Sequence, residues 1–306
     1  MLLSPDVFKI DCSVVVQRIE AFIRNAMLSM HRTGIVVPLS GGLDSSTVAG
    51  LCARAVGKEN VTGLMLPDIK GSPYALRFGR LVVKELGIRG HVINTTAILG
   101  AAGAYHFIAN LVPSRRLLST MVKRALAGSG RNLFLEGIKG SNDPFMRRAL
   151  ASFYARQRAR VVVTCRYADL HRLLVAGSAH KSEDLLGLFV KFGIDDSADI
   201  MPLKHLYRSH ILQIARYIGV PNAVVERSPN PEVLPGVEDK YFDILRVPSD
   251  QVDLVLFGLE HGMSDEEIVE QSGVSGVKTA EIREMAEMSS HMRSPSMSVN
   301  PLSMTD

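Results

Sequence analysis

The first third of the chain alternates between short apolar runs and segments with helical periodicity. Residues 35–39, 61–66 and 91–94 are apolar enough to predict three strands, and the segments between them predict helices that end near Gly57 and Gly87. This alternation favours an α/β fold with a doubly wound, Rossmann-like parallel sheet, whose ligand binds at the carboxyl ends of the strands. Before the first strand, hydrophobic residues recur at three- and four-residue steps, which predicts a helix from about 5 to 31.

The rest of the chain is less uniform. A long helix is predicted from about 144 to 171, followed by a fourth strand at 173–176. Between 97 and 148 we expect two helices, at about 97–111 and 115–127, and then a loop marked by Gly and Asn-Asp-Pro. From 289 onward, Ser, Met and Pro predict a loop or tail. We interpret 1–306 as a single domain, with an N-terminal helix (1–33), an α/β core (34–221) that carries an atypical insert at about 97–148, and a loop with C-terminal helices (222–306).

Composition narrows the class of protein. Hydrophobic residues make up 46% and charged residues 22% of the 306 positions, which is typical of a soluble globular protein. The three cysteines are scattered without CxxC spacing, which argues against a disulfide scaffold or a zinc site. Neither a signal peptide nor an apolar run of about 18 residues is visible, so we expect a cytoplasmic protein with no membrane span.

Positive charge is concentrated in one part of the chain. The net charge is only +4, but basic residues far outnumber acidic ones between Arg115 and Arg172. Such a region suits a polyanion, either a nucleotide or a nucleic acid. It is equally consistent with solvated helix faces and ion pairs to the more acidic C-terminal third. Because the sequence lacks paired cysteines and an RNA-binding module, we consider a nucleic-acid partner the weaker interpretation.

A glycine-containing loop follows the first predicted strand and reads Ser40-Gly41-Gly42-Leu43-Asp44-Ser45. Glycine allows unusual backbone φ values and close approach of a ligand, and the start of the next helix offers free N–H groups to an anion. The hydroxyls are further donors, and Asp44 can hold a cation. The pattern is neither a Walker loop nor a GxGxxG fingerprint. A simple capped turn is the plain alternative, but Ser-Gly-Gly-x-Asp-Ser resembles the pyrophosphate-binding loop of the N-type ATP pyrophosphatases.

A second region makes the resemblance more specific. Residues 174–193, Leu-Val-Ala-Gly-Ser-Ala-His-Lys-Ser-Glu-Asp-Leu-Leu-Gly-Leu-Phe-Val-Lys-Phe-Gly, are similar to the "GT-x-x-x-x-E…G-x-F-x-K-Y-G" segment of the NAD synthetase family. The similarity continues through 198–203, 206–221, 234–236 and 255–262, and Ser72-Pro73 fits as well. It covers most of the chain and is weakest at 97–148.

This resemblance implies an ammonia-dependent ligase. In the family, the carboxylate of deamido-NAD attacks the α-phosphate of ATP and releases pyrophosphate, and ammonia then displaces AMP to give NAD. The resemblance implies that Mg²⁺ is held by Asp44 and Glu183, and that Asp44, Lys191 and Arg208 are catalytic. The implied contacts to ATP, the co-substrate, are Ser40, Gly41, Gly42, Asp44, Ser45, Ser178, Lys191 and Arg208.

Positions that contact the acid in the family are altered here. The implied deamido-NAD site comprises Ser152, Arg156, Asp195, Asn230 and His291. Ser152 replaces a family Asn, an acid is displaced to Asp195 or Asp196, and Met292 replaces a lysine. Adenylation is therefore expected, whereas the acceptor stays open between deamido-NAD and a different carboxylic acid.

The resemblance also implies partners. Family members are homodimers whose deamido-NAD site lies at the interface. The chain has no room for a glutaminase domain, so a separate glutaminase is a candidate ammonia source. Two further alternatives are a tRNA-modifying enzyme and a non-catalytic nucleotide-binding regulator.

Overall fold

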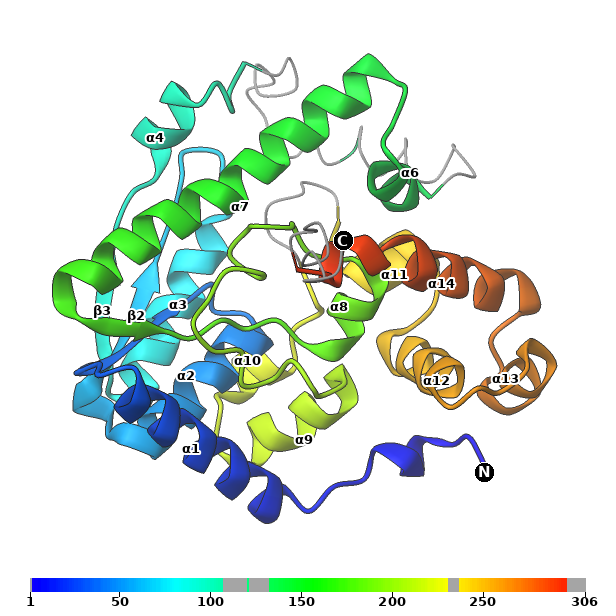
Figure 1. Ribbon diagram of the computed structural model, residues 1–306, viewed down its shortest axis with the longest axis horizontal. Coiled ribbons are helices and arrows are strands. Elements are labelled where there is room, and N and C mark those ends of the chain that lie inside the picture. The colour runs from blue at the N-terminus through cyan, green and yellow to red at the C-terminus, as the bar shows by residue number, and fades with distance from the viewer. Residues whose placement is uncertain (1, 107–119, 121–131, 231–236, 296–306) are drawn as a thin grey trace, which may run out of the picture.

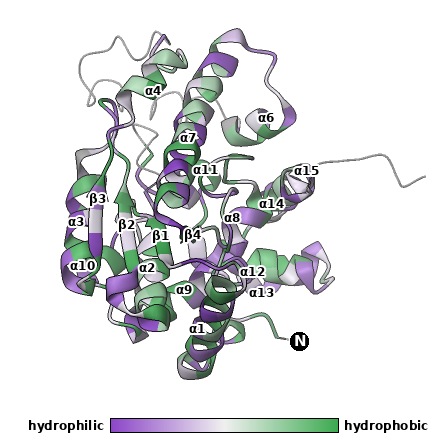
Figure 2. Cartoon of the chain, turned by 60° about the vertical axis from the view of Figure 1, so that its left-hand side comes forward, coloured by the Kyte–Doolittle hydropathy of each residue, from purple (hydrophilic) through white to green (hydrophobic). Residues whose placement is uncertain are grey.

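Four parallel strands form the centre of the protein. The computed structural model (Figure 1) describes residues 2–106, 120, 132–230 and 237–295. Its sheet has the strand order β3-β2-β1-β4, which Figure 2 shows. Val36, in the middle of β1, is paired with Thr62 on one side and with Val175 on the other. The strands are β1 (Gly34–Pro38), β2 (Val61–Met65), β3 (Arg89–Val92) and β4 (Leu173–Val175). The predicted doubly wound α/β fold is confirmed.

Both faces of the sheet are covered by helices. On one face lie α1 (Cys12–Ser29), α2 (Leu43–Val56) and α9 (Arg208–Tyr217), and on the other lies α7 (Pro144–His171). Side chains alternate along β1, so Ile35 and Val37 belong to the first core and Val36 to the second. Burial on both faces explains why the strands read as continuous apolar runs. The edge strand β3 is more hydrophilic, as Figure 2 shows.

The remaining elements lie around this sheet and beside it. Helices α11 to α14 build a separate hydrophobic core that includes Tyr241, Leu245 and Val255, and they extend from one side of the sheet domain (Figure 1). The further bounds are η1 (Pro5–Phe8), η2 (Lys58–Asn60), α3 (Pro73–Leu86), α4 (Thr96–Ala101), α6 (Leu133–Lys139), α8 (Lys181–Leu186), α10 (Asn222–Val225), α11 (Lys240–Leu245), α12 (Ser249–Glu260), α13 (Asp265–Ser272), α14 (Gly276–Met288) and α15 (Ser290–Arg293).

The predicted continuous helix over 5–31 is wrong at its start. A 3₁₀ turn, η1, comes first, and α1 begins only after Asp11, whose carboxylate accepts hydrogen bonds from the N–H groups of Ser13 and Val14. The break sends Phe8 into the separate core built by α11 to α14, where its ring meets those of Tyr207 and Phe257 edge-on, at centroid distances of 5.2 and 5.6 Å. Both segments are amphipathic, so the hydrophobic pattern runs across the break without interruption. Their apolar residues nevertheless pack in different cores, with Phe8 in one and Val16 and Ile19 in the other.

Other predictions were met in part. The helix over 144–171 is confirmed, and α2 and α3 end before Gly57 and Gly87, both with positive φ. The predicted loop before 144 contains α6, and the predicted tail begins with α15. Of the helices expected at 97–111 and 115–127, the structure describes α4, while most of the second lies outside the described residues. Within the described ranges, none of the helices combines the length and apolar character needed to cross a lipid bilayer.

The loop between β1 and α2 packs tightly against α3. Gly41 has a φ of +74°, and a Cβ at this position would lie 2.5 Å from the backbone nitrogen of Gly79 and 2.6 Å from Cβ of Phe78. The neighbouring Gly42 has a φ of −81°, and a Cβ there would meet only the Ser40 hydroxyl, at 3.3 Å. Of the two glycines, Gly41 is therefore the one that the backbone requires.

We predict that Gly41→Ala lowers the free energy of unfolding by about 2–4 kcal/mol, because it combines a disfavoured φ with a clash against backbone. Gly42→Ala is the matched control and should change it by less than about 1 kcal/mol. Urea denaturation of both variants measures the difference. Equal effects of the two substitutions would contradict this account of the loop.

A buried carboxylate joins three helices near the carboxyl end of the sheet. Asp253 of α12 is fully buried and accepts hydrogen bonds from the hydroxyl of Ser182 (2.6 Å) and from the N–H (2.8 Å) and hydroxyl (2.7 Å) of Ser209. The Ser182 hydroxyl in turn accepts a bond from the N–H of Arg208, at 2.9 Å. Asp253 therefore holds the beginnings of α8 and α9 side by side.

Replacing Asp253 by Ala should lower the free energy of unfolding by about 2–4 kcal/mol, because buried donors on α8 and α9 lose their acceptor. Asp250→Ala, at an exposed position on the same helix, should cost at most about 1 kcal/mol. Thermal or urea unfolding of the two variants is the measurement. A loss below 1 kcal/mol for Asp253→Ala would show that the network does not stabilise this junction.

Candidate active site

The order of the strands creates a crevice between β1 and β4. From β1 the chain moves outward through β2 to β3, and it then returns across the opposite face through α7 to place β4 on the other side of β1. The connections leaving β1 and β4 therefore diverge, which is where doubly wound sheets bind ligands. A cavity opens at this point, and nine residues predicted from the sequence line it: Ser40, Gly42, Asp44, Ser45, Ser178, Glu183, Asp195, Arg208 and Asn230.

The loop after β1 is arranged to receive an anion. Gly42 is the N-cap of α2, and no side chain caps the helix there. The hydroxyls of Ser40 and Ser45 lie 3.1 Å apart, and Ser40 accepts a hydrogen bond from the N–H of Gly42 at 3.2 Å. Arg227, whose guanidinium lies 4.0 Å from the ring centroid of Phe78, donates to the Gly41 carbonyl at 3.2 Å.

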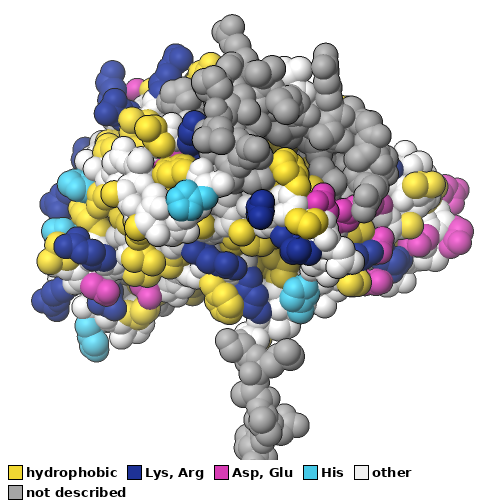
Figure 3. Space-filling view, turned by 90° about the horizontal axis from the view of Figure 1, so that it is seen from above, with side chains coloured by type: hydrophobic (Ala, Val, Ile, Leu, Met, Phe, Trp, Pro, Cys, Tyr) yellow, Lys and Arg dark blue, Asp and Glu magenta, His cyan; other side chains and the backbone are white. Residues whose placement is uncertain are grey.

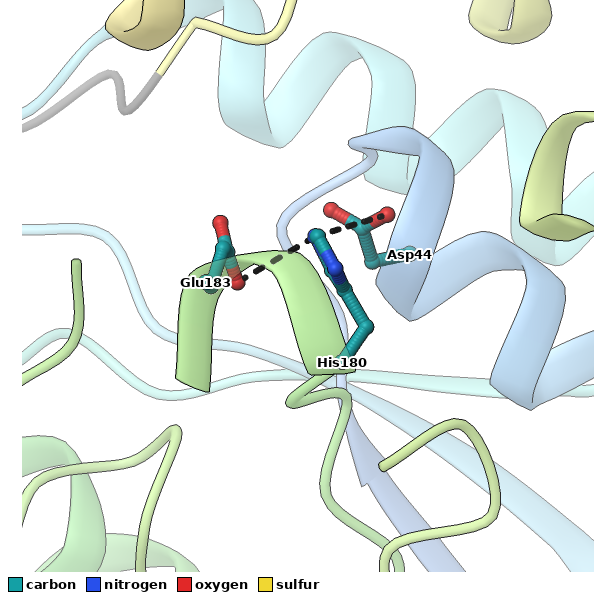
Figure 4. Close-up of side chains that lie close together, drawn as sticks. All are labelled: Asp44, His180 and Glu183. Atoms are coloured by element: carbon teal, nitrogen blue, oxygen red, sulfur yellow. Dashed lines mark ion pairs between the residues drawn. The ribbon is translucent and has the colours of Figure 1, made fainter. Parts of the chain in front are cut away.

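Two carboxylates and an imidazole converge beside this loop. Figure 4 shows His180 between Asp44, from the first turn of α2, and Glu183, from the first turn of α8. Nε2 of His180 lies 3.5 Å from Oε2 of Glu183 and 3.9 Å from Oδ1 of Asp44. One ligand atom from each of the three residues lies within 4.8 Å of the others. His180 was not predicted, although it lies between the predicted Ser178 and Glu183.

Two basic side chains balance the carboxylates. Nη1 of Arg208 lies 3.7 Å from Oδ1 of Asp44, and Lys240, the first residue of α11, forms an ion pair with Glu183. Burial alone would raise the pKa of Asp44, but neighbouring His180, Lys240 and Arg208 outweigh it and lower that pKa. Burial lowers the pKa of His180 to about 3, so its imidazole is neutral at physiological pH. Sequence reasoning missed Lys240, because nothing in its surroundings marks it among the chain's many lysines.

Lys191 and His291 lie together but away from the cavity lining. The Lys191 ammonium donates to the backbone carbonyls of His291, at 2.8 Å, and Ser294, at 2.9 Å. The His291 ring is exposed, and its Nδ1 lies 2.8 Å from the carbonyl of Met288. Lys191 therefore ties the loop after α8 to the segment around α15, and the predicted contacts of both residues with ATP or substrate stay predictions.

Ser152 and Arg156 of α7 lie outside the cavity lining. The Ser152 hydroxyl donates to the Ala104 carbonyl at 2.5 Å, and buried Arg156 lies 4.0 Å from Oδ1 of Asp68. Four residues apart, they share one face of the helix, and neither belongs to the cavity lining, whereas Gln157 and Arg160 do. Their assignment to the deamido-NAD site also stays a prediction.

Described residues of the basic region between Arg115 and Arg172 make contacts within the protein. Arg158 donates to the Lys191 carbonyl at 3.3 Å, and Lys139 pairs with Glu284 of α14. Figure 3 shows Lys and Arg spread over this face, with Asp and Glu gathered at the end formed by α13 and α14. These pairings match the interpretation of helix faces and ion pairs with the acidic C-terminal third.

Asp195 gives the site a pH dependence. Burial raises the pKa of Asp195 to about 6 against the pull of Arg160, with Asp44 and Asp196 adding to the rise. At pH values between the ordinary pKa of 3.8 and the raised pKa of about 6, the folded protein binds more protons than the unfolded chain. The free energy of unfolding therefore falls as pH rises through that window. Above it, Asp195 is ionised in the folded protein, and the loss of stability from burying this charge is complete.

We predict that Asp195→Asn is more stable than the original protein at pH 7.5, because the amide does not ionise. The difference should shrink as pH falls below 6 and disappear near 4. Denaturant unfolding at several pH values, with divalent cations chelated, measures it. A difference that does not change with pH would contradict the assigned pKa shift.

Comparisons with known proteins agree with this geometry. Residues 15–114 and 139–296 match the model of the protein family described as NAD synthase. The chain is 33% identical over 259 residues to an NH(3)-dependent NAD(+) synthetase of Coprothermobacter proteolyticus, covering 82% of this chain and 86% of the relative. It is 32% identical over 298 residues to one of Rhizobium meliloti, covering 91% and 88%.

Solved structures share the fold. An NMN synthetase from Francisella tularensis superposes with a TM-score of 0.70 at 21% identity, over 95% of this chain and all of that chain. An NH3-dependent NAD synthetase from Campylobacter jejuni gives 0.67 at 22%, with the same coverage. The chain belongs to the NAD synthase family.

Proposed function

We propose that this chain is an ammonia-dependent NAD synthetase. The carboxylate of deamido-NAD attacks the α-phosphorus of ATP, the bond to the β-phosphate oxygen breaks, and pyrophosphate leaves. Ammonia then attacks the acyl carbon, and AMP departs with formation of the amide of NAD and loss of a proton. The observation that supports this most directly is the pair of carboxylates, Asp44 and Glu183, beside the uncapped start of α2.

The residues present fit Mg²⁺. Oδ1 of Asp44 is buried and has no hydrogen-bond partner in the part of the chain that the structure describes, and Glu183 offers a second carboxylate within reach. Carboxylate oxygens and water are the ligands that Mg²⁺ prefers. Asp44 and Glu183 would hold the ion, which supplies charge neutralisation to the phosphates of ATP when bound.

The chain's own groups would bind the departing pyrophosphate. The N–H groups at the start of α2 and the hydroxyls of Ser40 and Ser45 face the cavity together. Arg208 and Lys240 pair with Asp44 and Glu183 in this structure. A cation on the two carboxylates would replace these pairs and leave both basic side chains free to bind phosphate oxygens. Ser178, at the end of β4, is a further hydroxyl for ATP, and Lys191 would approach it only after leaving its present carbonyl partners.

The acceptor acid would occupy the side of the cavity formed by Asp195 and Asn230. Arg160 and Gln157 of α7 lie on the same lining and add polar groups there. A second candidate function is the amidation of a different carboxylic acid by the same adenylation. It is favoured by the position of Ser152 and Arg156, whose polar groups contact Ala104 and Asp68 outside the cavity lining.

We further propose a homodimer, with ammonia supplied free or by a separate glutaminase. Exposed apolar side chains within one arc of α1 support a covered surface there: Val14, Phe22 and Leu28 are 50%, 48% and 66% exposed. Sedimentation velocity at micromolar concentration should give a particle of twice the chain mass. A monomer at that concentration would rule the dimer out.

Incubation with ATP, Mg²⁺, ammonium and deamido-NAD should yield NAD, AMP and pyrophosphate in equal amounts. Omitting deamido-NAD should abolish pyrophosphate release, because no carboxylate is present to be adenylated. Nicotinate mononucleotide is the matched alternative acid. Turnover with nicotinate mononucleotide but not with deamido-NAD would support the amidation of a different carboxylic acid. If pyrophosphate is released with neither acid, the protein adenylates neither of them.

Asp44→Ala should lower the rate of pyrophosphate release at least about 100-fold, since the phosphates lose a metal ligand that stabilises their charge. Asp250→Ala, exposed on α12, is the control and should turn over normally. Coupled measurement of pyrophosphate gives both rates. Normal turnover by Asp44→Ala would show that the site is wrongly assigned.

A further inference from the structure

We infer that His180 is a third protein ligand of the metal, so that the site binds Mn²⁺ or another first-row divalent ion more tightly than Mg²⁺. The inference rests on the metal site of the proposed function, and it adds an imidazole nitrogen to the two carboxylates. It concerns which ion this chain selects.

The position of His180 suits a ligand. His180 is the N-cap of α8 and Glu183 lies three residues later in the first turn, so one short segment presents both groups toward Asp44 of α2 (Figure 4). The distances from Nε2 to the two carboxylates are 3.5 and 3.9 Å, and all three ligand atoms lie within 4.8 Å of one another. Ligands at about 2.1 Å from one ion are separated by about 3 to 4.2 Å, so little movement is needed.

The ring lacks any other partner. His180 is 0% exposed, and neither Nδ1 nor Nε2 has a hydrogen-bond partner among the described residues. Burial of polar atoms without partners is costly, and such atoms usually mark a missing water or ion. Oδ1 of Asp44, which faces the same space, is likewise buried without a hydrogen bond. Two unsatisfied ligand atoms from different helices therefore point to one position.

A purely structural role explains the geometry less well. If His180 served to orient the carboxylates, its N–H would donate to one of them at about 2.7–3.2 Å. The observed separations of 3.5 and 3.9 Å are longer than that. They leave room for an ion between the ring and the two acids. Lys240 and Arg208, which pair with those acids, would then turn toward the phosphates.

The donor set determines the preference among ions. Mg²⁺ favours oxygen ligands and water, whereas an imidazole nitrogen suits first-row ions such as Fe²⁺, Ni²⁺ and Zn²⁺. Mg²⁺ can therefore use the two carboxylates alone, whereas an ion that accepts nitrogen gains affinity from the imidazole as well. Mn²⁺ is the informative probe because it accepts both oxygen and nitrogen and is paramagnetic.

The test is Mn²⁺ binding to the chelator-treated full chain without nucleotide, followed by electron paramagnetic resonance, with Mg²⁺ measured by competition. We expect one tight Mn²⁺ site, at least about tenfold tighter than Mg²⁺, with ¹⁴N modulation in pulsed spectra. His180→Asn should remove the ¹⁴N signal and weaken Mn²⁺ about tenfold, while leaving Mg²⁺ within about threefold. His261→Asn, at an exposed histidine on the end of α12, is the matched control.

The outcomes separate this inference from the proposed function. If the original protein binds one Mn²⁺ without ¹⁴N coupling, His180 is not a ligand, and this spectrum decides even if His180→Asn fails to fold. Asp44→Asn and Glu183→Gln should weaken both ions. If those variants lose binding while His180→Asn does not, the inference fails and the carboxylate site stands. If none of the three weakens either ion, the proposed metal site fails as well.

Discussion

The parallel pairing of β1 with both β2 and β4 is the constraint on which the rest of the structure depends. Val36 has a strand partner on each side. The connection from β1 to β2 crosses one face of the sheet through α2, and the connection from β3 to β4 crosses the opposite face through α7. These crossings bury a core on each face and leave a crevice where the connections diverge. The glycine loop and the start of α8 come together there because each follows directly from one of the two strands. Asp253 then fixes the two helix starts, α8 and α9, against each other.

Local patterns were sufficient for the elements whose whole signal lies in adjacent residues. The strands β1 and β2, the helix α7 and the glycine stops at Gly57 and Gly87 are of this kind, whereas β3, predicted at 91–94, lies two residues earlier at Arg89–Val92. Where the pattern was ambiguous, tertiary packing decided. The hydrophobic periodicity runs through Asp11, but the backbone changes direction there. Phe8 before this point and Val16 after it pack in different cores. The short helix α6 was missed because glycines on both sides resemble a loop.

The candidate site was predictable in its acids and less so in the groups around them. The family resemblance implied that Asp44 and Glu183 lie together, and the structure brings them within reach of one ion. Lys240 and Asp253 lie far along the chain, and only the folded arrangement of α11 and α12 brings them to α8. On α7 the sequence showed that Ser152 and Arg156 share a face. It did not show which way the helix is turned, and that depends on contacts with Asp68 and Ala104.

The contact between Phe8 and Phe257 bears on how the chain folds during synthesis. The ring at position 8 contacts Tyr207 and His210, but it also contacts Phe257, which leaves the ribosome later, so part of its final environment does not yet exist. The sheet and its helices are complete in sequence by Tyr217, which allows them to assemble first. The part of the ring that will meet Phe257 must meanwhile stay unburied. The contact between Phe8 and Phe257 closes a long loop and forms last, so this step is slow. Until then the nascent chain exposes apolar surface near position 8, to which a chaperone can bind.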